Sequence, residues 1–211
     1  WEVYPDGQHI MKYEEMTLKK VDLAIFNAKP NMLRKAHLNR KSYYVPHGCP
    51  SSGAIISMQN KPHDFPKTGE LFLGYWGAID KECVDVELLL WLSGRHPEWT
   101  FVLIGPIYER DKKVFFKLKE RKNISFLGHK NNGERYKYLS FFDIALLCAC
   151  PNEVELKASQ LKFWEYVAIG LPIVGIPVEE YVDYEWFYAA RSELEWEEMI
   201  LRASKENTPG K

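Results

Sequence analysis

The sequence lacks the cysteine and glycine motifs that usually indicate a metal or a bound cofactor. Cys49, Cys83, Cys148 and Cys150 form no CxxC pair and have no histidine at metal-ligand spacing. We interpret them as free thiols, with Cys148 and Cys150 as neighbours on one face of a strand end. The motifs GxGxxG and GxxxxGK[ST] are also missing, which argues against a dinucleotide dehydrogenase and a P-loop NTPase.

Neither sign of charge dominates. The 211 residues contain 28 Lys and Arg against 29 Asp and Glu, so the composition does not indicate a general nucleic-acid or membrane-surface binder. No apolar run reaches the length of a membrane span, and residues 1–10 lack the basic start and apolar stretch of a signal peptide. The first residue is Trp1 rather than Met, so we expect a segment of a longer protein. We expect that protein to be located in the cytoplasm.

What the sequence does have is a steady alternation of strand-like and helix-like patterns. Apolar residues make up 46% of the chain and aromatic residues 14%, which is enough for a sizeable core. The expected strands are VDLAIFN from Val21, SYYVP from Ser42, LFLGYW from Leu71, TFVLIG from Thr100, ISFLG from Ile124, DIALLC from Asp143 and PIVGI from Pro172. The clearest expected helices are Val84–Gly94, Asp111–Lys122, Glu134–Phe142 and Ser192–Ser204. The pattern predicts an α/β fold with a doubly wound parallel sheet.

One segment breaks the alternation. Residues 50–69 are rich in Pro, Gly, Ser and Asn, which is typical of a linker or loop. We therefore expect the main domain to span residues 70–191, with a C-terminal helix and tail over 192–211.

Glycines follow several of the expected strands. Gly74 and Gly77 follow the strand from Leu71, Gly105 the next strand and Gly128 the one after it. Glycine lets a ligand approach the backbone, and loops that lead into helices present free amides to phosphate. For each glycine alone, a turn that needs positive φ is the simpler explanation. Their equivalent places together predict a ligand groove at the carboxyl ends of the strands.

The stretch SQLKFWEYVAIGLPIVGIP, residues 159–177, contains a carboxylate in an otherwise apolar setting. Ser159 is the expected N-cap, Gly170 suits the position after the last turn and Pro172 prevents continuation, which predicts a helix over residues 160–169. No face of this helix is cleanly polar, so Glu165 needs a hydrogen-bonding partner. The candidates are Lys162 or a group that is not protein.

Six segments together carry a family pattern. They are VDLAIFNAKPNMLRKA, YYVPHGCP, LFLGYWGAIDKECVDVELLLWLSGRHPEWTFVLIGP, NISFLGHK, RYKYLSFFDIALLC and LKFWEYVAIGLPIVGIP. In this order they resemble the donor-binding half of retaining GT-B glycosyltransferases (group 1, family 4-like), which include many bacterial polysaccharide transferases. The last segment is the most specific, because it is similar to the family's lKl.EYlA.GkPVV.

The resemblance implies a site for a nucleotide diphosphate sugar, UDP- or GDP-linked. In the family the Glu of the EY pair holds the ribose hydroxyls, and Glu165 is the matching residue. Lys162 would lie near the diphosphate, and the backbone of Leu127–Lys130 near the base. The full set of donor-binding residues implied is Gly77, Lys81, Gly105, Gly128, His129, Ser159, Gln160, Leu161, Lys162 and Glu165. Without the resemblance, an internal ion pair between Glu165 and Lys162 would be the simpler hypothesis.

The sequence departs from the family at two positions. Lys157 stands where the family often has a Glu that contacts the donor sugar, so Glu155 takes that role or the sugar is held differently. Ala78 replaces the family's phosphate-binding Arg, which leaves Lys81 as the nearest basic residue. For catalysis, Lys157 and His47 are the candidates.

The resemblance also implies how the chain is organised and what it does. Residues 1–49 resemble the tail of an N-terminal acceptor domain, the rest of which is missing, and the crossover into the donor domain. The expected reaction is sugar transfer to a hydroxyl of a saccharide or lipid-linked acceptor, with retention, in polysaccharide biosynthesis near the inner membrane surface. No cofactor or metal is expected, and no DxD-type carboxylate pair is clear. A nucleotide-sugar epimerase and a non-catalytic nucleotide-binding module are the alternatives.

Overall fold

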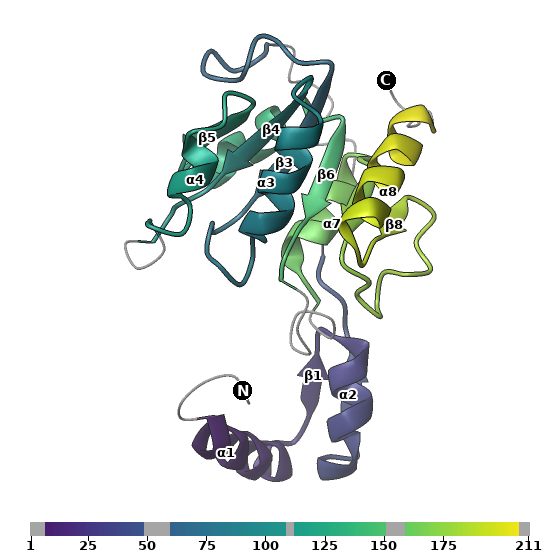
Figure 1. The fold of residues 1–211 in the computed structure, drawn as a ribbon. Helices are drawn as coiled ribbons and strands as arrows, with labels where there is room; N and C mark the ends of the chain where they lie inside the picture. The colour runs from purple at the N-terminus through teal and green to yellow at the C-terminus, as the bar shows by residue number, and fades with distance from the viewer. Residues whose placement is uncertain (1–6, 49–59, 109–111, 151–158, 207–211) are drawn as a thin grey trace.

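The computed structural model describes residues 7–48, 60–108, 112–150 and 159–206. Most of them form a doubly wound α/β domain around one six-stranded parallel sheet (Figure 1). The strand order is β5-β4-β3-β6-β7-β8. The strands are β3 (Leu71–Trp76), β4 (Trp99–Ile104), β5 (Ile124–Gly128), β6 (Ile144–Leu147), β7 (Ile173–Gly175) and β8 (Phe187–Ala189). The predicted fold class is confirmed.

Helices cover both faces of this sheet. They are α3 (Val86–Arg95), α4 (Phe116–Lys119), α5 (Arg135–Leu139), which continues the short 3-10 helix η4 (Asn132–Glu134), α7 (Leu161–Ala168) and α8 (Glu193–Lys205). From β3 the chain moves through α3 to β4 on one side, and from β6 through α7 to β7 on the other. Because such connections are right-handed, α3 and α7 cover opposite faces. The winding reverses between β3 and β6, which is where ligands bind in folds of this kind.

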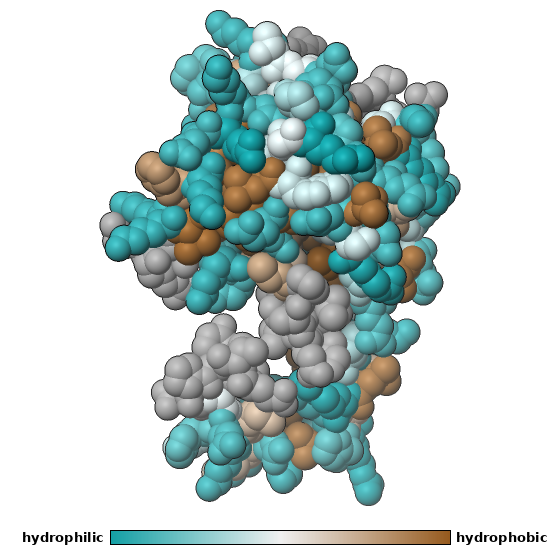
Figure 2. Space-filling model, in the orientation of Figure 1, coloured by the Kyte–Doolittle hydropathy of each residue, from teal (hydrophilic) through white to brown (hydrophobic). Residues whose placement is uncertain are grey.

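The N-terminal residues form a small separate unit. It contains α1 (Gly7–Lys20), β1 (Ala24–Phe26), α2 (Lys29–Lys35), the 3-10 helix η1 (Ala36–Leu38) and β2 (Ser42–Tyr44). The two strands pair in parallel as a sheet of their own, below the large sheet in Figure 1. Apolar side chains stay exposed on this unit, with Ile25 at 63% and Tyr43 at 52%. The surface seen in Figure 2 is mostly hydrophilic, and its apolar groups are scattered over both parts.

Several element boundaries differ from the predictions. The strand expected from Val21 begins only at Ala24, and β8 was not predicted because WFYAA lies between polar residues with no strand signal before it. The helix expected over 111–122 is reduced to α4, and the helix expected from Glu134 begins as η4. The start of α8 is as expected, since Ser192 accepts a hydrogen bond from the Glu195 amide at 3.3 Å.

The segment expected as a linker joins the core of the sheet domain before Glu70. Phe65 is 2% exposed, and its ring packs beside those of Phe72, Phe141 and Phe142 with centroids 5.3 to 6.2 Å away. Burial of an aromatic ring this size contributes about 1.5–3 kcal/mol to folding. The described part of this segment therefore belongs to the folded domain.

Candidate functional site

Three of the expected glycines meet at the carboxyl ends of neighbouring strands. The Gly77 amide donates to the Ile104 carbonyl at 2.9 Å, and the Gly105 amide to the Gly128 carbonyl at 3.0 Å. Gly77 and Gly105 have φ values of +151° and +152°, and a Cβ on Gly105 would lie 1.7 Å from the Gly77 carbonyl oxygen. Only glycine fits so close an approach. The backbone of β3, β4 and β5 is thus brought together at one edge of the sheet.

Gly74 plays a different part from the one expected. It lies within β3 and does not follow it, paired with Val102 of β4 and Ala145 of β6. A Cβ at this position would lie 1.9 Å from the Phe142 ring. Gly74 therefore makes room for Phe142 in the core, and its assignment to a ligand loop was wrong.

Lys162 points from α7 toward the glycine edge. Its Nζ donates to the Tyr75 hydroxyl at 2.8 Å and lies 4.5 Å from the centre of that ring. The Tyr75 hydroxyl in turn donates to the Ala78 carbonyl at 2.7 Å. A Cβ on Gly77 would lie 3.2 Å from the Lys162 Nζ. The structure therefore places this ammonium group beside the loop that follows β3.

Glu165 is one of the few buried charged residues, with 4% exposure. Its partner is Arg135 at the start of α5, whose Nη1 donates to the Glu165 Oε1. Burial raises the pKa of Glu165, and the charges of Arg135 and Lys162 oppose that rise. The alternative of an internal ion pair between Glu165 and Lys162 is not what the structure shows, because the Lys162 ammonium group bonds to Tyr75. Sequence reasoning missed Arg135, which is 30 residues away and has no marker in the sequence.

The start of α7 also differs from the prediction. Gln160 is the N-cap residue, without a side-chain capping bond, and α7 begins at Leu161. The Ser159 hydroxyl accepts from the Trp164 indole Nε1 at 3.4 Å, so Ser159 as N-cap was wrong. The backbone amide of Gln160 donates a hydrogen bond to the Tyr181 hydroxyl. Because the Tyr166 hydroxyl accepts from the Trp76 amide at 2.9 Å, α7 is tied to the end of β3.

The other expected residues have different surroundings. His129 is exposed after β5, and the Lys81 side chain is 62% exposed, 3.8 Å from Glu82. His47 Nε2 lies 2.8 Å from Asn27 Nδ2 in the N-terminal unit. Lys157 and Glu155 lie outside the described residues.

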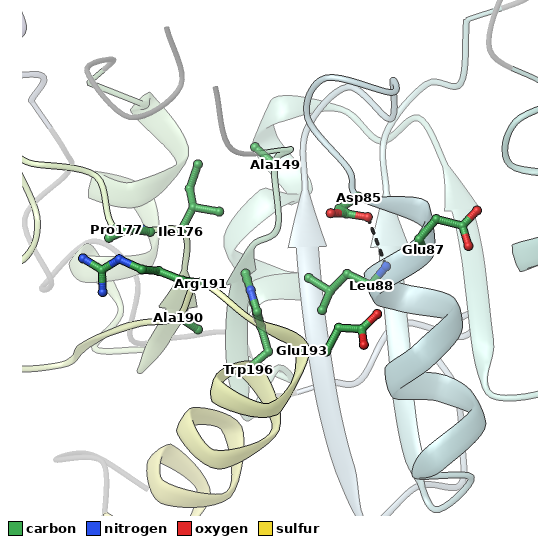
Figure 3. A pocket seen from close by; sticks show the side chains of 10 residues that line it. All are labelled: Asp85, Glu87, Leu88, Ala149, Ile176, Pro177, Ala190, Arg191, Glu193 and Trp196. Carbon is green, nitrogen blue, oxygen red and sulfur yellow. Dashed lines mark hydrogen bonds between the residues drawn. The ribbon is translucent and has the colours of Figure 1, made fainter. Parts of the chain in front are cut away.

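A cavity of about 380 Å³ opens at the carboxyl ends of β6, β7 and β8, between the first turns of α3 and α8. Figure 3 shows Leu88 and Ile176 on its two sides, with Trp196 between them. It is lined by Asp85, Glu87, Leu88, Ala149, Ile176, Pro177, Ala190, Arg191, Glu193 and Trp196. None of the expected donor-binding residues lines it, although Lys81 lines a neighbouring hollow of similar volume with Lys113 and Lys117.

In the part of the chain that the structure describes, no group of three or more His, Cys, Asp or Glu side chains is arranged to hold a metal ion. Across the same residues, no helix is both long and apolar enough to cross a bilayer.

Comparison with characterised proteins identifies a weakly similar sequence. No protein-family model matches. A putative teichuronic acid biosynthesis glycosyltransferase of Bacillus subtilis, TuaH, is 27% identical over 105 residues, which are 50% of this chain and 26% of that protein. This chain thus spans about a quarter of the relative's length.

Solved structures share the fold over most of the chain. HepE of Anabaena, in complex with UDP and glucose, matches with a TM-score of 0.66 at 13% identity, covering 88% of this chain and 54% of HepE. Sucrose-phosphate synthase of Thermosynechococcus elongatus matches with a TM-score of 0.71 at 15% identity, covering 97% of this chain and 55% of the synthase. WaaG, a glycosyltransferase involved in lipopolysaccharide biosynthesis, matches with a TM-score of 0.57 at 16% identity, covering 86% and 53%. The chain spans about half the length of these proteins and has the fold of the GT-B glycosyltransferases.

Proposed function

We propose that this chain, which has a GT-B fold, is the donor-binding part of a glycosyltransferase that uses a UDP- or GDP-linked sugar. The observation that carries the proposal is that Lys162 lies beside Gly77 after β3, the strand next to which the sheet reverses its winding, with the buried Glu165 one turn further along α7. The two groups lie one helical turn apart on α7, and they suit different parts of a nucleotide. A carboxylate can accept hydrogen bonds from the neutral ribose hydroxyls, and an ammonium group complements the negative diphosphate.

Each part of the donor has a chemical counterpart in this region. The Glu165 carboxylate can accept hydrogen bonds from ribose hydroxyls, and the Lys162 ammonium group can bind the diphosphate. The first turn of α7 and the Gly77 loop add backbone amides near the same place. The base is assigned to the backbone of Leu127–Lys130, by similarity to the family.

In the proposed reaction, the bond between the sugar's anomeric carbon and the diphosphate breaks and a bond to the acceptor oxygen forms. The nucleoside diphosphate leaves with the electron pair, and its oxygen takes up the proton that the acceptor hydroxyl loses. Stabilisation of the departing diphosphate by Lys162 and helix amides lowers the barrier for this step. Retention of configuration is part of the proposal, and His47 and Lys157 remain the candidates for further catalytic contacts.

The acceptor is assigned to a larger N-terminal domain. The sheet of β1 and β2 has only two strands in parallel, whereas parallel sheets are normally larger and buried on both faces. The exposure of Ile25 and Tyr43 is what an edge of a larger sheet would show. We assign this unit to the tail of that domain. For the whole enzyme we propose a role in polysaccharide biosynthesis, in keeping with the names of TuaH and WaaG. Its location in the cytoplasm near the inner membrane surface is part of the proposal.

The second candidate function is a nucleotide-binding module without activity of its own. It is favoured by the contacts of His47, a catalytic candidate, whose Nε2 lies 2.8 Å from Asn27 Nδ2 in the N-terminal unit. Such a module would bind the nucleotide but would not hydrolyse or transfer the sugar.

Calorimetry with UDP and GDP tests the proposal. One of the two should bind and should raise the thermal midpoint, because a ligand that binds only the folded state stabilises it. The variant Glu165→Gln should weaken binding by about 1.5–3 kcal/mol, the range for a hydrogen bond to a charged group. Glu198→Gln, an exposed position on α8, is the matched control and should bind normally.

Two outcomes would decide between the candidates. If no nucleoside diphosphate shifts the midpoint at millimolar concentration, donor binding by this chain is refuted. Binding without hydrolysis of any nucleotide sugar would favour the module.

A further inference from the structure

The pairing of Glu165 with Arg135 raises a question of access. The Glu165 side chain is 6% exposed, whereas the Arg135 side chain is 18% exposed. The arginine is therefore the outer member of the pair. A ribose that reaches the Glu165 carboxylate from solvent would meet the guanidinium group first.

Arg135 is held in this position from several sides. Besides its bond to Glu165, its Nη2 donates to the Asn132 Oδ1 at 2.8 Å. The guanidinium carbon lies 5.6 Å from the centre of the Trp76 ring, within the range of a cation–π contact. Asn132 belongs to η4, Trp76 to β3 and Glu165 to α7. The Arg135 guanidinium group therefore connects α5 to three other elements.

The arrangement is nevertheless incomplete. The Arg135 Nε is buried and has no hydrogen-bond partner among the described residues. A buried donor without an acceptor costs free energy that is recovered when the group reaches water or another acceptor. This unsatisfied Nε therefore lowers the free energy needed to separate Arg135 from Glu165.

We propose that Arg135 covers Glu165 in the free chain and gives way to the ribose hydroxyls when a nucleotide binds. The inference rests on the proposed function. The ribose hydroxyls replace the Nη1 donor on the carboxylate, and Arg135 keeps its contacts with Asn132 and Trp76 or turns to solvent. In the free chain the Lys162 Nζ bonds to the Tyr75 hydroxyl, whereas the carboxylate accepts from Arg135. Arg135 is then a residue that sets nucleotide affinity by competing with the ligand.

The variant Arg135→Met tests this exchange of Arg135 for the ribose hydroxyls on Glu165, by calorimetry with UDP and GDP at pH 8. Methionine keeps much of the length of the side chain and its packing on Trp76 but removes the competing donors. For the nucleotide that the wild type binds, the variant should bind about tenfold more tightly, as expected when one charge-assisted hydrogen bond no longer has to be broken. Its thermal midpoint without ligand should fall, because Glu165 loses its partner. Tighter binding by a less stable protein is the distinguishing result.

A ribose analogue shows whether the gain arises at Glu165. The 2′,3′-dideoxy form of the same nucleotide has no hydroxyl to donate, so its affinity should not increase in Arg135→Met. Arg121→Met, at an exposed position just after α4, is the matched control and should leave both affinities unchanged. If Arg135→Met does not fold, Arg135→Lys, which lacks the planar fork, should show a smaller gain in the same direction.

The possible failures are distinct. Weaker binding in Arg135→Met, or an equal gain for the dideoxy nucleotide, overturns the exchange while the proposed function stands. If neither the wild type nor Arg135→Met binds UDP or GDP, both the exchange and the proposed function are overturned.

Discussion

At the scale of single residues, Gly105 shows how closely the backbone is packed at the sheet edge. Its φ of +152° lies in a region that residues with a side chain rarely adopt. The position of a Cβ is occupied by the Gly77 carbonyl oxygen. Both effects come from the backbone itself, so rotation of a side chain cannot relieve them.

We expect Gly105→Ala to destabilise the protein by about 2–4 kcal/mol, since steric strain adds to the unfavourable φ. The free energy of unfolding in urea measures this. Gly133→Ala is the control, because a Cβ there meets nothing within 4 Å, and it should change stability by less than about 1 kcal/mol. Equal effects of the two substitutions would contradict the packing explanation.

At the scale of elements, Asp64 joins the segment before β3 to the loop after β5 and to α5. Its Oδ2 accepts from the Lys130 Nζ at 2.6 Å, and its Oδ1 from the Tyr138 hydroxyl at 2.9 Å. Burial tends to raise the pKa of Asp64, but the hydrogen bonds from Lys130 and Tyr138 outweigh it and the pKa is lowered. One carboxylate thus connects residues 60–69 with the loop after β5 and with α5.

The lowered pKa fixes the direction of the pH dependence. A carboxyl group whose pKa is lower in the folded state stabilises the fold at every pH above its unfolded pKa of about 3.9. That contribution is lost as the pH falls from there through the lowered folded pKa.

Asp64→Asn should therefore lower the free energy of unfolding at pH 7 by about 1–3 kcal/mol, because the hydrogen bonds from Lys130 and Tyr138 no longer go to a charged carboxylate. The difference from the wild type should shrink below about pH 4, where the wild-type carboxyl group takes up its proton. Urea unfolding of both proteins at a series of pH values measures this difference in the free energy of unfolding. Asp183→Asn, at an exposed position, should show no such trend, and a constant difference for Asp64→Asn would refute the argument.

At the scale of the whole molecule, a hydrogen bond joins the N-terminal unit to the sheet domain. The Tyr44 hydroxyl at the end of β2 donates to the Glu180 Oε1 in the loop between β7 and β8. Burial and the bond to Glu180 raise the pKa of Tyr44 above its ordinary value, so the phenol keeps its proton throughout the neutral range. The Glu180 Oε2 is buried without a partner among the described residues, so the carboxylate depends on Tyr44.

We expect Tyr44→Phe to loosen the small unit while leaving the large sheet intact. Hydrogen exchange should quicken at the amides of β1 and β2 and around Glu180, because local opening no longer has to break this bond. The strands β3, β4 and β6 should keep their protection. Tyr43→Phe, at a side chain that is 52% exposed, should leave exchange unchanged, and slow exchange in Tyr44→Phe would contradict the coupling.

The sequence alone determined the larger features of the protein. The strands β3, β4 and β5 lie within about a residue of their predicted bounds, because mainly apolar runs between turn residues are a local signal. The parallel, doubly wound fold followed from the alternation of such strands with helices. The pattern of residues 160–169 predicted that a carboxylate at Glu165 needs a partner, and its burial agrees with this.

Only the tertiary structure decided which partners the functional side chains have. Arg135 reaches Glu165 across 30 residues and Lys162 reaches Tyr75 across 87, while Gly74 proved to accommodate Phe142 from 68 residues away. These contacts depend on which helices lie on the same face of the sheet and how they are rotated. Local propensity and hydrophobic periodicity specify a helix and its buried face, but the pairing of charges across elements is fixed by packing, where burial makes each unpaired group costly.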